Sequence, residues 1–243
     1  MSETKKQRRD AGSIRVGARD LVGMSWCAEQ GAMGIHQLAT LFAQIDQRPV
    51  SVDAARKTVS RWLDRGWATS RTLLKGQPPF VWLTAAGMRV SGLRFASEEP
   101  ALATLAHNSD VVAIRLAIEA AYPKDSEWRS ERSIRAVVPP RTRGKNSPHL
   151  PDGEIILSDG RIIAIERERV AKTIERTRNI QMGLLTRRYD YDATADVVVA
   201  ALAPRYSAVH YYASDEALSV VQKAAAALPG DLGSRLEIVH WAS

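Results

Sequence analysis

The stretch that decides the fold is residues 149–168, HLPDGEIILSDGRIIAIERE, in which two apolar runs flank a short turn sequence. The turn, SDG, suits a three-residue hairpin loop with its glycine in the left-handed conformation. Such a loop pairs Leu157 with Arg161, and the resulting register places Asp152 directly opposite Glu166. The stretch therefore predicts a β-hairpin with carboxylates at the open end of both strands.

The carboxylates of this hairpin form a pattern of their own. Side chains alternate between the two faces of a strand, so Glu154, Glu166 and Glu168 are expected on the same face as Asp152. Cross-strand neighbours lie roughly 5 Å apart, and carboxylates that close repel unless a cation or a shared proton compensates. The pattern hints at a divalent-metal site of the kind that nucleases use on DNA.

Composition and charge favour nucleic acid over a membrane as the partner. Of the 243 residues, 45% are hydrophobic and 25% charged, which predicts packed cores in one large or two small domains. The formal net charge is +7 and the pI about 9.7, a balance typical of proteins that bind nucleic acid. No apolar run approaches the roughly 18 residues of a membrane-crossing helix. The single cysteine, Cys27, rules out an internal disulfide framework. We expect a cytoplasmic protein with a flexible basic arm at residues 1–15.

Residues 16–95 predict three helices followed by a β-hairpin. Ser51 is a favourable N-cap for the third helix, and Gly66 is a favourable stop. The expected helices are 18–31, 34–42 and 51–65, and the expected strands are 67–74 and 80–83. This order is typical of the winged-helix version of the helix-turn-helix, whose third helix enters the major groove of DNA.

The third expected helix has one apolar face and one basic face. Cations on the hairpin would contact phosphates, which position a protein without reading sequence. The alternatives are that the basic face is only the solvated side of an amphipathic helix, or that the winged helix docks a protein. The side chains expected to contact DNA are Arg56, Lys57, Ser60, Arg61, Arg65, Arg71 and Lys75.

Residues 105–243 predict a second domain with a mixed sheet covered by helices on both faces. The histidines at 107, 149 and 210 are scattered, without the spacing of metal ligands. A basic loop at 139–148 is either solvated or a contact to the DNA backbone. Besides the hairpin, the expected helices are 110–122, 170–187 and 215–228, and the expected strands are 127–138, 195–202 and 236–241.

Four short motifs lie between residues 18 and 200: LAHN at 105–108, Trp128 with Glu131, PDG at 151–153 and IERE at 165–168. Together with the order of elements, this set resembles the PD-(D/E)xK nuclease superfamily. More narrowly, the chain resembles the replication-relaxation family of plasmids and actinobacterial mobile elements. That family joins a winged helix to a nuclease-like domain. The resemblance implies a two-domain α+β or α/β protein with a PD-(D/E)xK-like mixed sheet flanked by helices.

The resemblance also implies a site. In the superfamily, carboxylates at the positions of Asp152 and Glu166 bind Mg²⁺, and a helical glutamate, here Glu119, joins them. The third motif position is usually a lysine that positions or activates the attacking water, whereas this chain has Glu168. Two alternatives follow. Either Lys172 replaces that lysine, as relocated lysines do elsewhere in the superfamily, or the site is catalytically inactive and the fold is kept for binding DNA or a partner.

Three functions stay open at this point. The first is a DNA-binding protein of a mobile genetic element, in replication, relaxation, conjugation or regulation, with a degenerate nuclease-like domain. The second is an Mg²⁺-dependent DNA endonuclease or nickase, and the third an adaptor that captures a relaxase or replication protein. A homodimer is expected because such DNA readers commonly bind paired half-sites. A simpler explanation of the carboxylates is surface ion pairing, worth little, with Arg167, Arg169 or Lys172.

Overall fold

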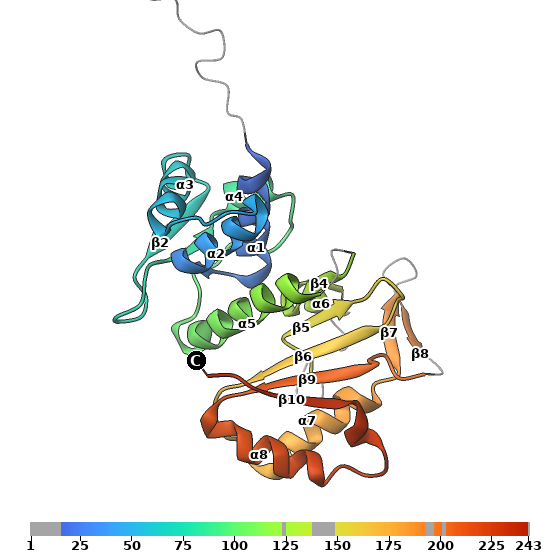
Figure 1. The fold of residues 1–243 in the computed structure, drawn as a ribbon. Coiled ribbons are helices and arrows are strands. Elements are labelled where there is room, and N and C mark those ends of the chain that lie inside the picture. Colours follow the sequence, from blue (N-terminus) through green and yellow to red (C-terminus); the bar gives the residue numbers. More distant parts are fainter. Residues whose placement is uncertain (1–15, 123–124, 138–148, 193–196, 201–202, 243) are drawn as a thin grey trace, which may run out of the picture.

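The computed structural model describes residues 16–122, 125–137, 149–192, 197–200 and 203–242 of a mixed α+β protein (Figure 1). The expected basic arm at 1–15 and basic loop at 139–148 lie outside the described residues. The elements are α1 Ala18–Gln30, β1 Met33–Gly34, α2 Ile35–Asp46, α3 Val52–Asp64, β2 Ala68–Arg71, β3 Phe80–Leu83, α4 Ala85–Ser91, α5 Leu102–Ala121, β4 Glu127–Ser130, α6 Glu131–Val137, β5 Gly153–Ile156, β6 Ile162–Glu168, α7 Ile174–Thr186, β7 Tyr189–Asp192, β8 Val197–Ala200, β9 Ala208–Ala213, α8 Asp215–Ala226, the 3₁₀ helix η2 Leu232–Arg235 and β10 Leu236–His240.

The N-terminal lobe, residues 16–101, contains α1 to α4 and a three-stranded antiparallel sheet of order β1-β3-β2. Its core is formed by the apolar faces of α1, α2 and α3, with Phe42 packed edge-on against Trp62. The predicted N-cap is confirmed, because the Ser51 side chain accepts a hydrogen bond from the amide of Ala54. The strand expected at 67–74 ends at Arg71 instead.

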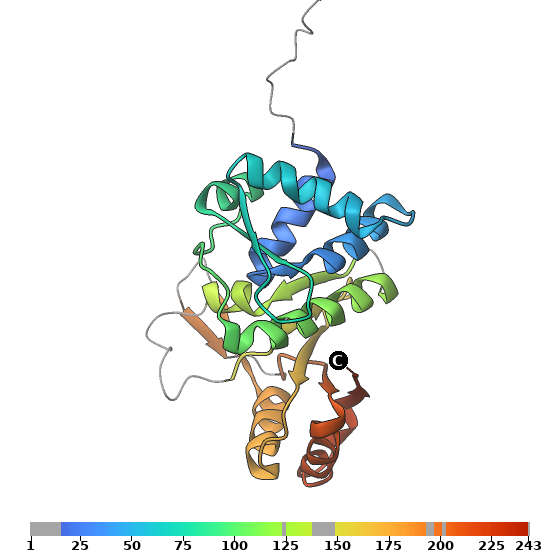
Figure 2. The ribbon, with the colours of Figure 1, turned by 90° about the vertical axis from the view of Figure 1, so that its left-hand side faces the viewer.

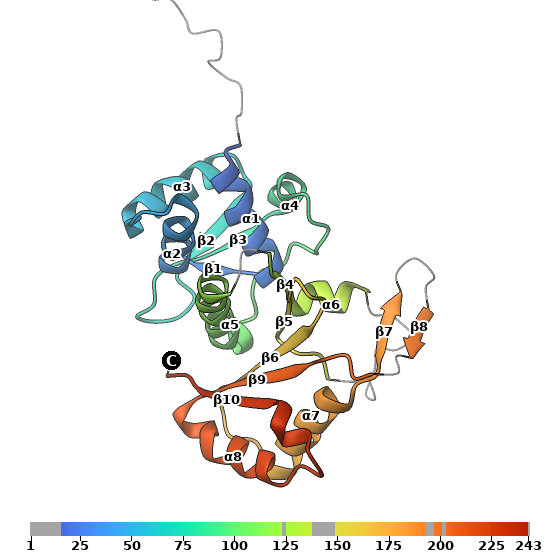
Figure 3. The same cartoon turned by 45° about the vertical axis from the view of Figure 1, so that its right-hand side comes forward.

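The C-terminal lobe, residues 125–242, is built on a five-stranded mixed sheet of order β10-β9-β6-β5-β4. Strands β10, β9 and β6 run parallel to one another, whereas β5 and β4 are antiparallel additions. Helices α7 and α8 cover one face of the sheet, and α5 covers the other (Figure 3). The predicted mixed sheet with helices on both faces is therefore present.

The hairpin at 149–168 has the predicted register. Gly153 pairs with Ile165, and the amide of Leu157 donates to the carbonyl of Arg161 at 2.9 Å. Gly160 has a φ of 81°, the left-handed conformation that the turn sequence requires. Local turn chemistry is thus enough to fix which residues of β5 and β6 face each other.

Four expected elements of the second half need correction. The strand expected at 127–138 ends at Ser130 and continues as α6, and the helix expected at 110–122 begins at Leu102. The helix expected at 170–187 begins after its N-cap Thr173. The strand expected at 195–202 pairs with β7 in a separate two-stranded ribbon, and the central position beside β6 belongs to β9, which the sequence analysis missed.

Helix α5 belongs to the cores of both lobes and lies between them (Figure 2). Val112 and Leu116 pack into the N-terminal core, whereas Ile114 packs onto the five-stranded sheet. Side-chain amides of α2 reinforce the contact, since Gln37 and Gln44 donate to α5 carbonyls at 2.7 and 3.0 Å. The two lobes therefore hold each other through one shared helix.

Two minor expectations concern the cysteine and the membrane. Cys27 is fully buried, and burial raises the pKa of its thiol to about 12. Across the described part of the chain, every helix is too short or too polar to span a bilayer.

Candidate functional site

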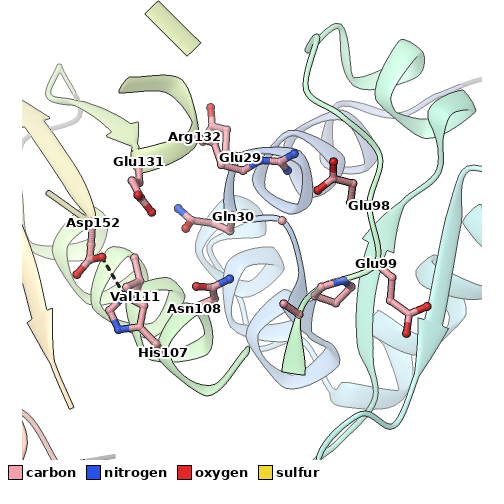
Figure 4. Close-up of a pocket in the computed structure, with 13 residues that line it drawn as sticks. Glu29, Gln30, Glu98, Glu99, His107, Asn108, Val111, Glu131, Arg132 and Asp152 are labelled. Carbon is pink, nitrogen blue, oxygen red and sulfur yellow. Dashed lines mark hydrogen bonds and ion pairs between the residues drawn. The ribbon is translucent and has the colours of Figure 1, made fainter. Parts of the chain in front are cut away.

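Asp152 lies at the open end of the hairpin, one residue before β5. Its Oδ2 accepts a hydrogen bond from the backbone amide of Arg167 at 2.7 Å, which fixes the carboxylate against β6. Its Oδ1 lies 2.9 Å from Nε2 of His107 on α5 (Figure 4). The next residue must be small, because a Cβ on Gly153 would lie 2.2 Å from the indole of Trp128. The Pro-Asp-Gly motif thus combines a packing constraint with a positioned carboxylate.

Glu166 lies on β6 with only 3% of its surface exposed. Its Oε1 is 2.8 Å from Nε2 of His149, the residue that begins the decisive stretch. Its Oε2 is buried and has no hydrogen-bond partner among the described residues. A buried carboxylate oxygen without a partner is costly, which indicates that this position is built to receive a further group.

Lys172 approaches the same strand from the segment before α7. Its Nζ lies 2.5 Å from Oε2 of Glu168, and this carboxylate is 4% exposed. The lysine therefore reaches the third motif position by pairing with the residue that occupies it. The pair places the Lys172 ammonium near the other carboxylates, and this ammonium compensates the charge of Glu168.

We call Asp152, Glu166, His107 and His149 the carboxylate–histidine cluster. The two histidines are scattered along the sequence, as expected, but folding brings each of them onto one of the two carboxylates. His107 is 45 positions from Asp152 along the chain, so no local spacing signals the pair. The only available signal was the LAHN motif at 105–108.

The four carboxylates of the hairpin stretch were expected on one face of the sheet, and they do not all take part in one cluster. Asp152 precedes β5 and contacts His107 of α5. The three glutamates pair in register with residues that pack on the face covered by α7 and α8. Glu154 is fully buried and serves a separate ion network, in which Arg205 and the hydroxyl of Tyr206 bind it at 2.9 and 2.7 Å. The cluster therefore does not include Glu154.

Glu119 does not join the cluster, which corrects the expectation from the resemblance. It lies twelve residues after His107 on α5, roughly 18 Å away at 1.5 Å per residue. There its Oε1 accepts a hydrogen bond from Nε of Arg115 at 2.7 Å. Its role is to hold an arginine between the lobes.

Ion pairing explains part of the carboxylate pattern. Arg167 and Arg169 both bind Asp110, at 2.8 and 3.2 Å. Lys172 pairs with Glu168, as that explanation expects, and the pair is largely buried. The carboxylates lie inside the protein, where an uncompensated charge is expensive.

Burial and mutual repulsion shift the titration of the cluster. Burial, and then the charge of Asp152, raises the pKa of Glu166 to about 7. Burial lowers the pKa of His107 and of His149, but the hydrogen bonds to Asp152 and Glu166 and the charges of these carboxylates together outweigh it, so both pKa values are raised. Glu166 and the two histidines therefore favour their protonated forms near neutral pH.

These shifts predict how folding stability depends on pH. A carboxyl pKa raised from 4.5 to about 7 gives stability that is present below pH 4.5 and is lost as pH rises through 7. A histidine with a raised pKa gives stability that is present below 6.5 and is lost above it. We expect the Tm in EDTA to fall between about pH 5 and 8, and Glu166→Gln to flatten this fall. Identical Tm–pH curves for the two proteins, measured by calorimetry, would contradict the burial of an ionised Glu166.

The donor set fits a divalent cation in one respect. Within the described residues, three or more acidic, histidine or cysteine side chains do not converge on one point. However, Mg²⁺ and Mn²⁺ keep several waters and are held by one or two carboxylates, which Asp152 and the partnerless oxygen of Glu166 supply. The carboxylates of Asp152 and Glu166, the second of which has one buried oxygen without a partner among the described residues, therefore suit a hydrated cation.

Comparison with family models, with curated proteins and with solved structures finds no match for this chain.

The two sides of the cluster differ in charge. Asp152 and His107 line a cavity of about 220 Å³ between the lobes, which Glu29, Glu98 and Glu131 make acidic (Figure 4). On the other side, His149 lines a second hollow of about 400 Å³ together with Glu175, Arg176 and Asn179 of α7, so that one acidic and one basic side chain balance there. The side of α7 is therefore the less repulsive one for a polyanion.

The expected DNA-contacting residues lie outside this cluster, on α3 and the β2–β3 hairpin. Helix α3 lies at the edge of the N-terminal lobe, away from the five-stranded sheet (Figure 1). Arg56 pairs with Asp53 at 2.7 Å, Arg61 with Asp20 at 3.2 Å, and Arg71 with Glu99. All seven expected side chains are exposed: Arg56, Lys57, Ser60, Arg61, Arg65, Arg71 and Lys75.

The hairpin is held in place by the shared helix. Leu73 and Leu74, just beyond β2, pack against a small cluster that contains Phe80, Trp82 and Leu105 of α5. Leu105 lies two residues before His107, which binds Asp152. The segment that carries Lys75 and the carboxylate–histidine cluster are therefore anchored to the same end of α5.

Proposed function

We propose that this chain binds double-stranded DNA through α3 and the β2–β3 hairpin. The observation that carries the proposal is the exposed basic face of α3 at the edge of the lobe. The element order α1-β1-α2-α3-β2-β3, with β1 pairing to β3, is typical of a winged helix and supports it. The motif resemblance suggests a mobile genetic element as the setting, and DNA recognition by a homodimer.

The ion pairs on this surface do not oppose DNA binding. The Arg56–Asp53 pair is 54% and 78% exposed, and pairs so exposed contribute little free energy. An arginine in such a pair exchanges its carboxylate for a phosphate at low cost, and each phosphate neutralised releases counterions. The surface is thus able to switch from internal pairs to a DNA backbone, and removal of Arg56, Lys57 and Arg61 is the direct test.

A second candidate function, metal-dependent hydrolysis of a phosphodiester, rests on the partnerless oxygen of Glu166. Asp152 and Glu166 would hold the cation, and the Lys172 ammonium lies at the neighbouring carboxylate. A bound divalent cation polarises a phosphoryl oxygen and lowers the pKa of water. The protein's own part is to orient the two carboxylates through His107, His149 and the amide of Arg167.

This second function predicts nicking of supercoiled plasmid in Mg²⁺ or Mn²⁺. Asp152→Ala and Glu166→Ala are each expected to lower the nicking rate at least about 100-fold, because each removes a ligand of the cation. Glu119→Ala is the matched control, since Glu119 is a glutamate of the shared helix α5 outside the cluster, and its rate should match that of the wild type. Absence of nicking with both cations, or equal rates in all four proteins, would remove this function and leave the DNA-binding proposal standing.

A further inference from the structure

A second buried polar atom without a partner lies next to that of Glu166. The hydroxyl of Tyr211 on β9 is inaccessible to solvent and has no hydrogen-bond partner among the described residues. The Tyr211 side chain as a whole is fully buried. A phenylalanine would fill the same space without burying a hydroxyl, so packing alone does not account for a tyrosine here.

Sheet register places the two residues that carry these atoms side by side. Strands β6 and β9 are parallel, and Glu166 is the direct partner of Tyr211. Partner residues of adjacent strands project their side chains from the same face, with Cβ atoms roughly 5 Å apart. Burial raises the pKa of the Tyr211 phenol, and the charges of Glu166, Glu168 and Asp152 raise it further.

The two atoms do not satisfy each other. Their arrangement leaves one donor and one acceptor unpaired on the same face of the sheet. A group that both accepts a hydrogen bond from the phenol and binds the carboxylate satisfies both atoms, and a water molecule on a cation does this. Mg²⁺ and Mn²⁺ retain several such waters when carboxylates bind them.

We propose that Tyr211 is a member of the same site, where its hydroxyl donates a hydrogen bond to a water of a hydrated divalent cation held by Asp152 and Glu166. The inference rests on the second candidate function, the metal-dependent one, and not on DNA binding by α3. Tyr211 acts as a positioning residue, because it contacts the cation through water. This role accounts for a phenol at a position where a phenylalanine would fill the same space.

The test is calorimetric titration of Mn²⁺ into the full-length protein and into Tyr211→Phe. The variant is expected to bind Mn²⁺ about 10-fold more weakly, because it loses one hydrogen bond to a group polarised by charge. In EDTA its Tm is expected to rise by about 2–5 °C, because an unsatisfied hydroxyl no longer has to be buried. A residue with a purely structural role would not produce opposite effects on affinity and stability.

Two controls separate the outcomes. Tyr212→Phe alters the next residue, whose ring packs against Trp241 on the opposite face, and should leave Mn²⁺ affinity within twofold. Glu166→Gln should abolish Mn²⁺ binding. If Glu166→Gln abolishes binding but Tyr211→Phe binds Mn²⁺ as tightly as the wild type, the role of Tyr211 is wrong and the metal-dependent function stands. If the wild type binds no Mn²⁺, both are wrong.

A measurement on the wild type covers the case in which Tyr211→Phe fails to fold. With ¹³C-labelled tyrosine, Mn²⁺ should broaden the NMR signal of Tyr211 more than that of any other tyrosine. Equal broadening of Tyr211 and Tyr212 would overturn the inference without use of a variant.

Discussion

Replacement of Arg56, Lys57 and Arg61 by alanine is expected to lower the affinity for duplex DNA on the order of 100-fold at 0.15 M salt. All three side chains are exposed on α3, and only Arg61 also contacts a buried group, the carboxylate of Asp20 at 3.2 Å. Each phosphate contact contributes about 0.9 to the slope of log K against log salt, so three lost contacts reduce the slope by about 2.7. Fluorescence anisotropy with a labelled duplex measures both the affinity and the slope.

The matched control removes the same number of positive charges elsewhere. A triple alanine variant of exposed cations outside α3 and the β2–β3 hairpin should reduce the affinity for DNA by less than about threefold, through net charge alone. If the two triple variants lose affinity equally, α3 is not the DNA-binding surface. If neither variant nor the wild type binds DNA at moderate salt, the adaptor role becomes the better explanation. The control positions are Arg94, Arg161 and Lys223.

Arg115→Met is expected to lower the free energy of unfolding by about 3–5 kcal/mol, because it leaves two carboxylates without their cation. Arg115 is 6% exposed and binds Glu29 of α1 and Glu119 of its own helix. Its guanidinium also lies 3.7 Å from the ring centroid of Trp26. One side chain thus joins α1 of the N-terminal lobe to the shared helix, and methionine retains only its apolar bulk.

Thermal unfolding measures this effect directly. For a chain of this length the loss corresponds to a fall in Tm of about 10 °C. Arg56→Met is the control, since it breaks an exposed arginine–aspartate pair on α3 and should change stability by less than about 0.5 kcal/mol. A change below about 1 kcal/mol for Arg115→Met would show that the lobes do not depend on this residue for their contact.

The features that could be predicted from sequence are those fixed by neighbouring residues. The Ser-Asp-Gly turn determines the pairing of β5 with β6, because a short loop with a left-handed glycine permits one register. Ser51 caps α3 through the amide of Ala54, a contact that also lies within one turn of chain. The apolar residues Leu38 and Phe42 of α2 recur at helical spacing and are buried for the same local reason.

The features that could not be predicted depend on contacts far apart in the chain. Ser109 resembles an N-cap, yet it lies inside α5, where its carbonyl accepts from Gln37 of the other lobe. The apolar run at 197–199 favours a central strand, whereas β9, with His210 and two tyrosines, takes that position. Periodicity does not decide which of two strands pairs with β6, because both satisfy it.

In the candidate site, too, the residues paired by local register were predicted and those brought in by tertiary packing were not. Asp152 and Glu166 were predicted because hairpin register alone brings them together. His107, His149 and Tyr211 were not, because α5, the start of the hairpin stretch and β9 each bring one side chain from a different part of the chain. Tertiary packing brings these side chains to the buried carboxylates, so the spacing of residues in the sequence does not predict them.

The measurement that tests the central claim most directly is the salt dependence of wild-type binding to duplex DNA, followed by anisotropy between about 0.05 and 0.3 M NaCl. If α3 and the hairpin hold the backbone, log K falls linearly with log salt, with a slope of about −3 to −6. A slope shallower than about −1, or no binding at 0.05 M salt, would contradict DNA binding by this surface.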